Sequence, residues 1–168
     1  MRVASSRSGD ESRWRVYDLM TSNKLFPIFL KLTGKKVLIV GGGFIALQKI
    51  QALLSTDAKL VVMAPLIIPE VKAQQGEFPN FRKIEFVERE YQLGDEKEFF
   101  LVIAATDIAE LNEVIYYRCQ DQAILVNSVD KPDNCDFYIP SVIESGDIKV
   151  AISTNGKSPS VSQRMRKD

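Results

Sequence analysis

The stretch KVLIVGGGFIALQKI, residues 36–50, decides the predicted fold. It starts with the apolar run 36–40, passes through three glycines, and continues with apolar residues that recur every three or four positions. This order predicts a buried strand, a tight turn and a helix with one apolar face. Gly41, Gly43 and Ala46 match the pattern G-x-G-x-x-A, whose small residues let a pyrophosphate approach the backbone at a helix N-terminus. Because the pattern lies between a predicted strand and a predicted helix, it favours a dinucleotide site over a simple turn.

Strands and helices continue to alternate after this stretch. Apolar runs predict strands at 59–64, 99–105 and 123–129 and an edge strand at 83–89, and apolar spacing predicts a helix from about Asp107. Parallel neighbours need crossover connections, so the alternation predicts an α/β fold with a Rossmann-like, doubly wound parallel sheet. We place this predicted dinucleotide-binding domain at 25–134 and expect 1–24 to be a disordered tail.

The pattern changes near residue 135. The runs 137–143 and 148–153 predict two strands, which a turn at Ser145-Gly146-Asp147 would join into a hairpin. Ser158 and Pro159 then favour the start of a helix, because serine caps helices and proline suits their first position. The chain ends soon after, at Asp168, so residues 135–168 are expected to be an incomplete second region.

Composition restricts the chemistry. The chain of 168 residues contains no histidine, which removes Ser-His-Asp and Cys-His catalysis and every histidine-based metal site. Lys plus Arg and Asp plus Glu both total 22, so nucleic acid is not an expected partner. No apolar stretch approaches the ~18–20 residues of a membrane span. Cys119 and Cys135 show no pairing pattern, which favours the cytoplasm.

Polar residues follow two of the predicted strands. Thr106 and Asp107 come directly after 99–105, and Asp130 comes after 123–129. Open α/β sheets bind ligands at the carboxyl ends of their strands, so these side chains are expected to face the cofactor crevice. Two simpler roles stay open: Thr106 or Asp107 as a helix cap, and Asp130 as a turn residue.

The end of the second predicted strand leaves the cofactor undecided. Ala64 and Pro65 lie where an acidic residue would bind the ribose of NAD, and no arginine is present for the phosphate of NADP. NAD, NADP and another adenine nucleotide therefore all remain open from these residues alone.

The basic C-terminal segment has two interpretations. Gly156-Lys157-Ser158 is not a P-loop, because the required first glycine falls on Ala151 and Pro159 follows the serine. Lys157 and Arg166 belong to a small basic cluster, which is either a solvated helix face or a clamp for a polyanionic ligand.

Four ordered stretches together resemble the precorrin-2 dehydrogenase family, which also forms the N-terminal part of siroheme synthases. The matching stretches are 25–49, 104–112, 127–143 and 152–166. The resemblance implies NAD-dependent oxidation of the tetrapyrrole precorrin-2 to sirohydrochlorin. Some members of the family also insert ferrous iron to make siroheme, and this second activity stays open for this chain.

The resemblance also implies roles for individual residues. Asp130 matches the catalytic aspartate, and Asn155 replaces one glycine of a Ser-Thr-Gly-Gly-Lys-Ser-Pro segment. No metal ligands are expected. Expected cofactor contacts are Gly41, Gly42, Gly43, Phe44, Ile45, Ala64, Pro65, Thr106 and Asp107, and expected substrate contacts are Asn127, Ser153, Thr154, Lys157, Ser158 and Arg166.

Family members continue into a mostly helical region that serves dimerisation and substrate enclosure. We therefore expect residues 135–168 to begin this region and the protein to form a homodimer. Two alternatives to the dehydrogenase remain: an NAD-binding regulatory module without catalysis, and an inactive truncated remnant.

Overall fold

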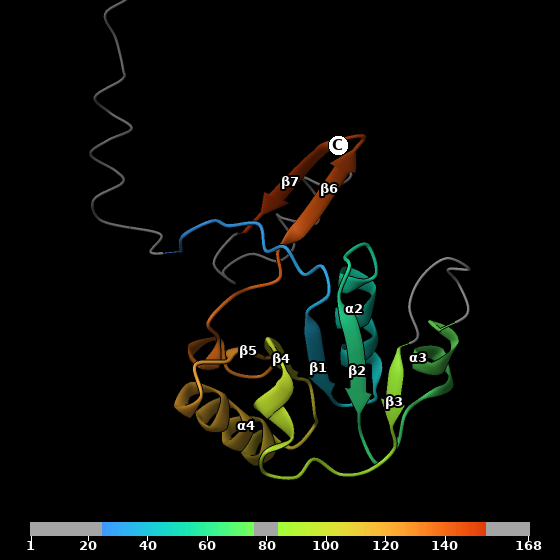
Figure 1. Cartoon of the computed structure of the whole chain (residues 1–168), viewed down its shortest axis with the longest axis vertical. Helices are drawn as coiled ribbons and strands as arrows, with labels where there is room; N and C mark the ends of the chain where they lie inside the picture. Colours follow the sequence, from blue (N-terminus) through green and yellow to red (C-terminus); the bar gives the residue numbers. More distant parts are fainter. Residues whose placement is uncertain (1–24, 76–83, 154–168) are drawn as a thin grey trace, which may run out of the picture.

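The computed structural model describes residues 25–75 and 84–153. A five-stranded parallel sheet with the order β3-β2-β1-β4-β5 forms its centre, and an antiparallel hairpin, β6-β7, projects from one side (Figure 1). The strands are β1 Lys36–Val40, β2 Lys59–Met63, β3 Glu85–Val87, β4 Leu101–Ala104, β5 Leu125–Ser128, β6 Ser141–Ser145 and β7 Ile148–Ile152. The predicted doubly wound parallel sheet is confirmed.

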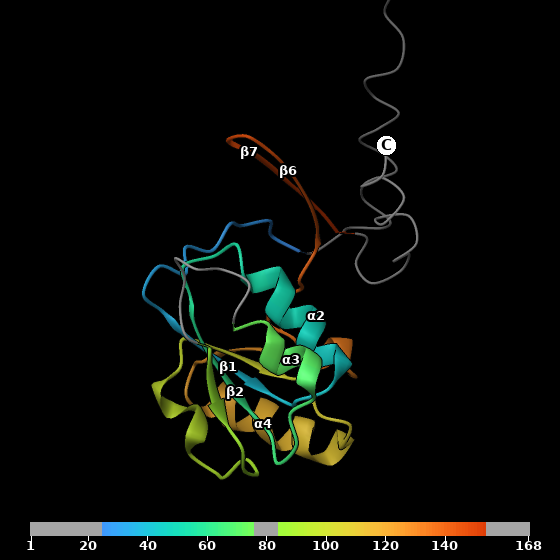
Figure 2. The ribbon, with the colours of Figure 1, turned by 90° about the vertical axis from the view of Figure 1, so that its right-hand side faces the viewer.

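Helices cover both faces of the sheet. Figure 2 shows α2 (Phe44–Leu53) and α3 (Pro69–Ala73) on one face and α4 (Ala109–Asp121) on the other. Alternate residues of each strand supply the two cores: Val37 and Ile39 pack with the α2 side, whereas Leu38 and Val40 pack with the α4 side. This double burial explains why the central strands read as continuous apolar runs.

The strand order predicts where a ligand would bind, which is at the carboxyl ends of the central strands. β1 pairs with β2 on one side and with β4 on the other, so the chain reverses its direction of winding between β1 and β4. Open α/β sheets bind ligands outside the carboxyl ends of the strands at such a switch point. The edge of interest is therefore formed by the residues that follow Val40, Met63, Ala104 and Ser128.

Several element boundaries differ from the predicted ones. Strand β6 begins at Ser141 rather than 137, because Pro140 lacks an N–H for pairing and Phe137 and Ile139 pack against the core instead. Helix α4 begins at Ala109, two residues after Asp107, with Ile108 as its N-cap. The five-residue helix α3 was not predicted, since it is too short to show a helical period. The expected tail and the helix expected at Ser158 lie outside the described residues.

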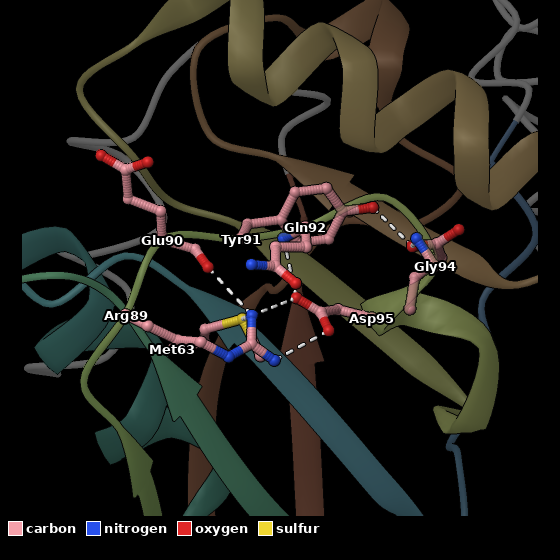
Figure 3. A network of polar contacts seen from close by, with 8 residues as sticks. Met63, Arg89, Glu90, Tyr91, Gln92, Gly94 and Asp95 are labelled. Carbon is pink, nitrogen blue, oxygen red and sulfur yellow. Dashed lines mark hydrogen bonds and ion pairs between the residues drawn. The ribbon is translucent and has the colours of Figure 1, made fainter.

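The connection from β3 to β4 is held by a charged clasp (Figure 3). Arg89 binds both carboxylate oxygens of Asp95, at 2.6 and 2.9 Å, and also donates to the carbonyl of Glu90 at 2.9 Å. The hydrogen bond from Arg89 keeps the pKa of Asp95 below its usual value, with smaller help from the backbone N–H of Gln92. The clasp therefore orders the loop that leads from the edge strand back to the centre of the sheet.

A buried carboxylate next to this clasp ties the loop to α4. Glu96 lies in the short 3-10 helix η1 (Asp95–Glu98) and is fully buried. It accepts hydrogen bonds from the Tyr91 hydroxyl, the Gly94 N–H and the Gln122 amide, at 2.5, 2.9 and 2.5 Å, and pairs with Arg118 at 3.3 Å. Desolvation raises the pKa of Glu96, but these hydrogen bonds outweigh it and the pKa lies below its usual value.

Glu96→Gln is expected to lower the free energy of unfolding by about 2–4 kcal/mol, because every partner of Glu96 is a donor and the new amide N–H groups would face other donors in a buried site. The contribution of Glu96 is present above about pH 4.3, its ordinary pKa, and is lost as the pH falls through the lower folded-state value. Urea unfolding of both proteins at pH 7 and pH 4 measures the difference, which should shrink at the lower pH. Glu98→Gln is the control, since Glu98 is exposed in its pair with Lys36, and it should leave the unfolding midpoint nearly unchanged.

Candidate active site

The glycine turn after β1 is built for close packing at its first two positions. Gly41 has a φ of +128°, and a Cβ atom there would lie 2.2 Å from the Ala105 carbonyl oxygen. A Cβ atom on Gly42 would lie 2.2 Å from the Leu66 carbonyl oxygen, and the Ile68 N–H donates to the Gly42 carbonyl at 3.0 Å. These two glycines therefore let the turn fit between the ends of β2 and β4.

Gly43 differs from its two neighbours. Its backbone is extended, and a Cβ atom there would meet nothing within 4 Å. Gly43 is the N-cap of α2, it has no side chain to satisfy the first N–H groups, and the first turn of α2 contains no acidic residue. The open side of Gly43 and the N-terminus of α2 thus offer an anion a direct approach to backbone donors.

Apolar side chains flank the turn. Phe44 and Ile45 are exposed in the first turn of α2, and Leu66 is exposed next to Gly42. Phe44 has 65% and Leu66 has 76% of its surface exposed, which is high for such large apolar residues. Ala64 is buried at the end of β2, whereas Pro65 is exposed. The turn therefore combines backbone hydrogen-bond donors, which suit a pyrophosphate, with apolar surfaces, which suit the flat rings of a dinucleotide.

The turn after β4 is closed by a buried amide. Thr106 donates to Asn112 Oδ1 through its hydroxyl at 2.7 Å and through its N–H at 3.2 Å, and its carbonyl accepts from Asn112 Nδ2 at 3.0 Å. Asp107 is exposed and does not cap α4, since no side chain caps that helix. Thr106 lies against Gly41, because a Cβ on that glycine would come within 3.2 Å of the Thr106 nitrogen.

The turn after β5 contains the candidate base. Asp130 is exposed and accepts a 2.6 Å hydrogen bond from the Ser128 hydroxyl. Desolvation raises the pKa of Asp130, but hydrogen bonds from Ser128 and Asn112 outweigh it, so the pKa lies below its usual value. At neutral pH the Asp130 carboxylate is ionised and available as a proton acceptor.

Register connects these turns. Ala104 pairs with Ser128 across β4 and β5, and the Val129 N–H donates to the Ala104 carbonyl at 3.1 Å. The Thr106 turn and the Asp130 turn are therefore neighbours, and Gly41 lies against the first of them. The structure thus brings the glycine turn, Thr106 and Asp130 to one edge of the sheet.

Of the six expected substrate contacts, the structure describes only Asn127 and Ser153. Asn127 is buried, and its amide donates to the Phe137 carbonyl at 2.9 Å, so it anchors the chain that leads to the hairpin. Ser153 is exposed at the end of β7. Thr154, Lys157, Ser158 and Arg166 lie outside the described residues.

Sequence reasoning missed several residues near this edge. Asn112 forms hydrogen bonds with Thr106, and Ser128 forms one with Asp130. Ser128 could have been found from the sequence, because it lies two residues before the aspartate. The Cys135 thiol donates to the Ser128 carbonyl at 3.1 Å, and burial raises its pKa. Burial lowers the pKa of Lys49, which faces the same thiol from α2. Nothing in the local pattern signals these last two contacts, because they join segments far apart in the chain.

Two classes of feature are not found in the described part of the chain. Residues 25–75 and 84–153 contain no group of three or more Cys, Asp or Glu side chains placed to hold a metal ion. Within the same ranges, no helix has the length and apolar character that crossing a membrane requires.

Comparison with known proteins agrees with this geometry. A family model described as "Putative NAD(P)-binding" matches residues 28–141. The chain belongs to this family. A second model, described as "Sirohaem biosynthesis protein central", matches residues 145–168, so the NAD(P)-binding part is followed by sequence typical of sirohaem biosynthesis proteins. The resemblance deduced from the sequence is thereby confirmed.

The chain is similar to siroheme synthases that are much longer than it is. It is 38% identical over 141 residues to the siroheme synthase of Thioalkalivibrio sulfidiphilus (strain HL-EbGR7), covering 84% of this chain and 28% of the relative. The siroheme synthase of Nitrosococcus oceani is 36% identical, with 83% and 29% covered. The solved structure of "SirC, precorrin-2 dehydrogenase" aligns with a TM-score of 0.71 and 28% identity, covering 86% of this chain and 69% of that one. The chain spans less than a third of the length of these two siroheme synthases.

Proposed function

We propose that this chain catalyses the NAD-dependent dehydrogenation of precorrin-2 to sirohydrochlorin. The proposal rests on one observation: the open side of Gly43 and the Asp130 carboxylate lie at the same edge of the sheet. A hydride acceptor and a proton acceptor are the two groups that such an oxidation needs. Similarity to siroheme synthases and to a precorrin-2 dehydrogenase supports precorrin-2 as the substrate.

The residues of the glycine turn fit NAD. The N–H groups at Gly43, Phe44 and Ile45 would hold the pyrophosphate, and Ala64 and Pro65 would face the adenosine half. NAD supplies a nicotinamide ring that accepts the hydride. We favour NAD over NADP because Arg89, the basic residue that reaches Met63 at the end of β2, is bound to Asp95.

Asp130 would take the proton that leaves with the oxidation. It is exposed and ionised, and the Ser128 hydroxyl donates to one of its oxygens at 2.6 Å. Lys157 and Arg166 are proposed to bind carboxylates of the tetrapyrrole. We further propose that Asp130 accepts pyrrole protons where iron insertion follows, with ferrous iron as a substrate of that step.

Incubation with precorrin-2 and NAD tests the proposed function. Oxidation to sirohydrochlorin changes the tetrapyrrole absorption spectrum and produces one NADH for each pair of electrons removed. An unchanged spectrum, with NAD binding intact by calorimetry, would favour the alternative of a regulatory module without catalysis. Calorimetric titration with NAD and NADP also decides which nucleotide the chain prefers.

A homodimer is the assembly that we propose. The hairpin and the segment 25–30 expose large apolar side chains. The exposed fractions reach 83% for Phe26, 68% for Phe29 and 67% for Ile148. A two-stranded unit cannot bury such residues alone, and a second copy of the chain would cover them.

Light scattering is expected to show a mass that rises with concentration, or association into larger particles. The double variant F26S/F29S should remain monomeric over the same range, and L93S, which removes an exposed leucine in the β3–β4 connection, is the control. A wild-type mass that stays monomeric at all concentrations would contradict the dimer.

We place the protein in the cytoplasm, a proposal that the two free thiols support. Burial raises the pKa of the Cys119 thiol to about 12, so this thiol stays protonated.

A further inference from the structure

Arg89 lies at the end of β2, although the sequence offers no arginine directly after that strand. Its Nη1 atom is 3.7 Å from the sulfur of Met63, the last residue of β2. Met63 pairs with Val40 at the end of β1, and its carbonyl accepts the Gly41 N–H at 2.8 Å. In dinucleotide-binding folds the end of the second strand, about 20 residues after the glycines, contacts the adenosine ribose, and an arginine nearby binds the 2′-phosphate of NADP. The fold therefore brings Arg89 to the expected ribose position from the end of β3.

The guanidinium of Arg89 is already bound to protein acceptors (Figure 3). Nη1 donates to one oxygen of Asp95 at 2.6 Å and to the Glu90 carbonyl at 2.9 Å, and Nη2 donates to the other Asp95 oxygen at 2.9 Å. The side chain of Asp95 is 17% exposed and that of Arg89 is 42% exposed. A two-point pair between arginine and a largely buried carboxylate is stronger than an ordinary surface ion pair, because the planar guanidinium matches both oxygens.

Other contacts hold the same loop without this pair. Glu96, the residue after Asp95, is fully buried and accepts hydrogen bonds from Tyr91, from Gly94 and from α4. On the other side of Arg89, Glu88 pairs with Lys72 of α3 at 2.8 Å. Ordering of the loop therefore does not by itself account for an arginine and an aspartate paired beside the ribose position.

We infer that Asp95 makes the chain select NAD over NADP, because it holds Arg89 in a pair that a 2′-phosphate would have to break. The inference rests on the proposed nucleotide site at the glycine turn. Arg89 cannot bind the phosphate at two points without giving up the carboxylate, and the ionised Asp95 adds a like charge near that phosphate. The 2′-hydroxyl of NAD carries no charge and leaves the pair intact. Asp95 is thus a specificity-determining residue that acts through Arg89.

Calorimetric titration of the full chain with NAD and with NADP tests this role. Asp95→Asn keeps the size of the side chain and an oxygen for the Gln92 N–H, which donates to Asp95 at 2.8 Å, but it removes the charge that holds Arg89. NADP affinity should rise roughly tenfold or more, since Arg89 can then form charge-assisted hydrogen bonds with the phosphate. NAD affinity should change little. Asp95→Ser shortens the side chain and serves as the second variant if asparagine still binds Arg89 or does not fold.

A double-mutant cycle separates release of Arg89 from simple loss of repulsion. Arg89→Gln is made alone and together with Asp95→Asn, and the gain in NADP affinity should disappear in the double variant. Glu98→Gln is the matched control, because it breaks another ion pair, with Lys36 at 2.8 Å, at the amino end of β1 and so at the opposite edge of the sheet. It should leave the affinities for both nucleotides unchanged.

Three results would overturn the inference. These are a wild type that binds NADP as tightly as NAD, an NADP affinity that does not rise in Asp95→Asn or Asp95→Ser while NAD still binds, and a gain that persists when Arg89 is also replaced. A wild type that binds neither nucleotide would overturn the nucleotide site and this inference with it. A wild type that binds NAD but does not oxidise precorrin-2 would overturn the proposed reaction alone, and the titrations would still decide the role of Asp95.

Discussion

Asp130→Asn is expected to lower turnover by roughly 10²–10⁴-fold, the usual loss when a general base is removed. The substitution keeps the shape of the side chain, and Ser128 can still donate to its oxygen, so the turn after β5 should persist. Asparagine cannot accept the proton that leaves the substrate in the proposed oxidation. NAD affinity should change little, because the glycine turn that would hold the pyrophosphate is not altered.

Single-turnover rates with saturating NAD are the right measurement, since they report the chemical step without product release. Asp133→Asn is the matched control: Asp133 is exposed in the 3-10 helix η2 (Pro132–Asn134), three residues along the same connection. Its rate should equal that of the wild type. A wild-type rate in Asp130→Asn as well would mean that Asp130 is a turn residue and that another group takes the proton.

The sequence predicted those parts of the fold that depend on residues close together in the chain. The run 36–50 contains a complete strand, turn and helix, and the structure has β1 and α2 in those places. The carboxyl ends of parallel strands meet at one edge, so the positions of Thr106 and Asp130 followed from strand order alone. Their proximity needed no knowledge of side-chain contacts.

What the sequence did not reveal depends on contacts between distant segments. Gly42 occupies a variable position of the glycine pattern, yet it packs against the Leu66 carbonyl, a contact that only the path of the β2–α3 connection creates. Asn112 looks like an ordinary polar helix residue until α4 lies beside the turn after β4. Glu96 belongs to a charged run that suggests a solvated surface, but it is buried among four donors from two segments, the β3–β4 connection and the end of α4.

Gly43→Val is expected to weaken NAD binding by roughly 10²-fold or more, because two or three hydrogen bonds from backbone N–H groups to the pyrophosphate would be blocked by the added methyl groups. The fold should survive. The backbone of Gly43 is extended, with a φ of −96°, which valine readily adopts, and a Cβ atom there meets nothing within 4 Å.

Gly42→Ala is the matched comparison, because it adds a single carbon one residue away. That carbon would lie 2.2 Å from the Leu66 carbonyl oxygen and 2.9 Å from the Ile67 Cα, so the connection after β2 must move. We expect Gly42→Ala to lose about 1–3 kcal/mol of unfolding free energy, as overpacked positions do. The two variants therefore separate a glycine needed for packing from a glycine needed for the ligand.

Thermal unfolding with and without NAD, together with calorimetric titration, distinguishes these effects. NAD should raise the Tm of the wild type, since a ligand that binds only the folded state stabilises it, and should leave the Tm of Gly43→Val unchanged. Gly42→Ala should start from a lower Tm and still gain stability from NAD where it folds. If Gly43→Val binds NAD with wild-type affinity, the pyrophosphate does not lie over this turn, and the assignment of the nucleotide site to the N-terminus of α2 is wrong.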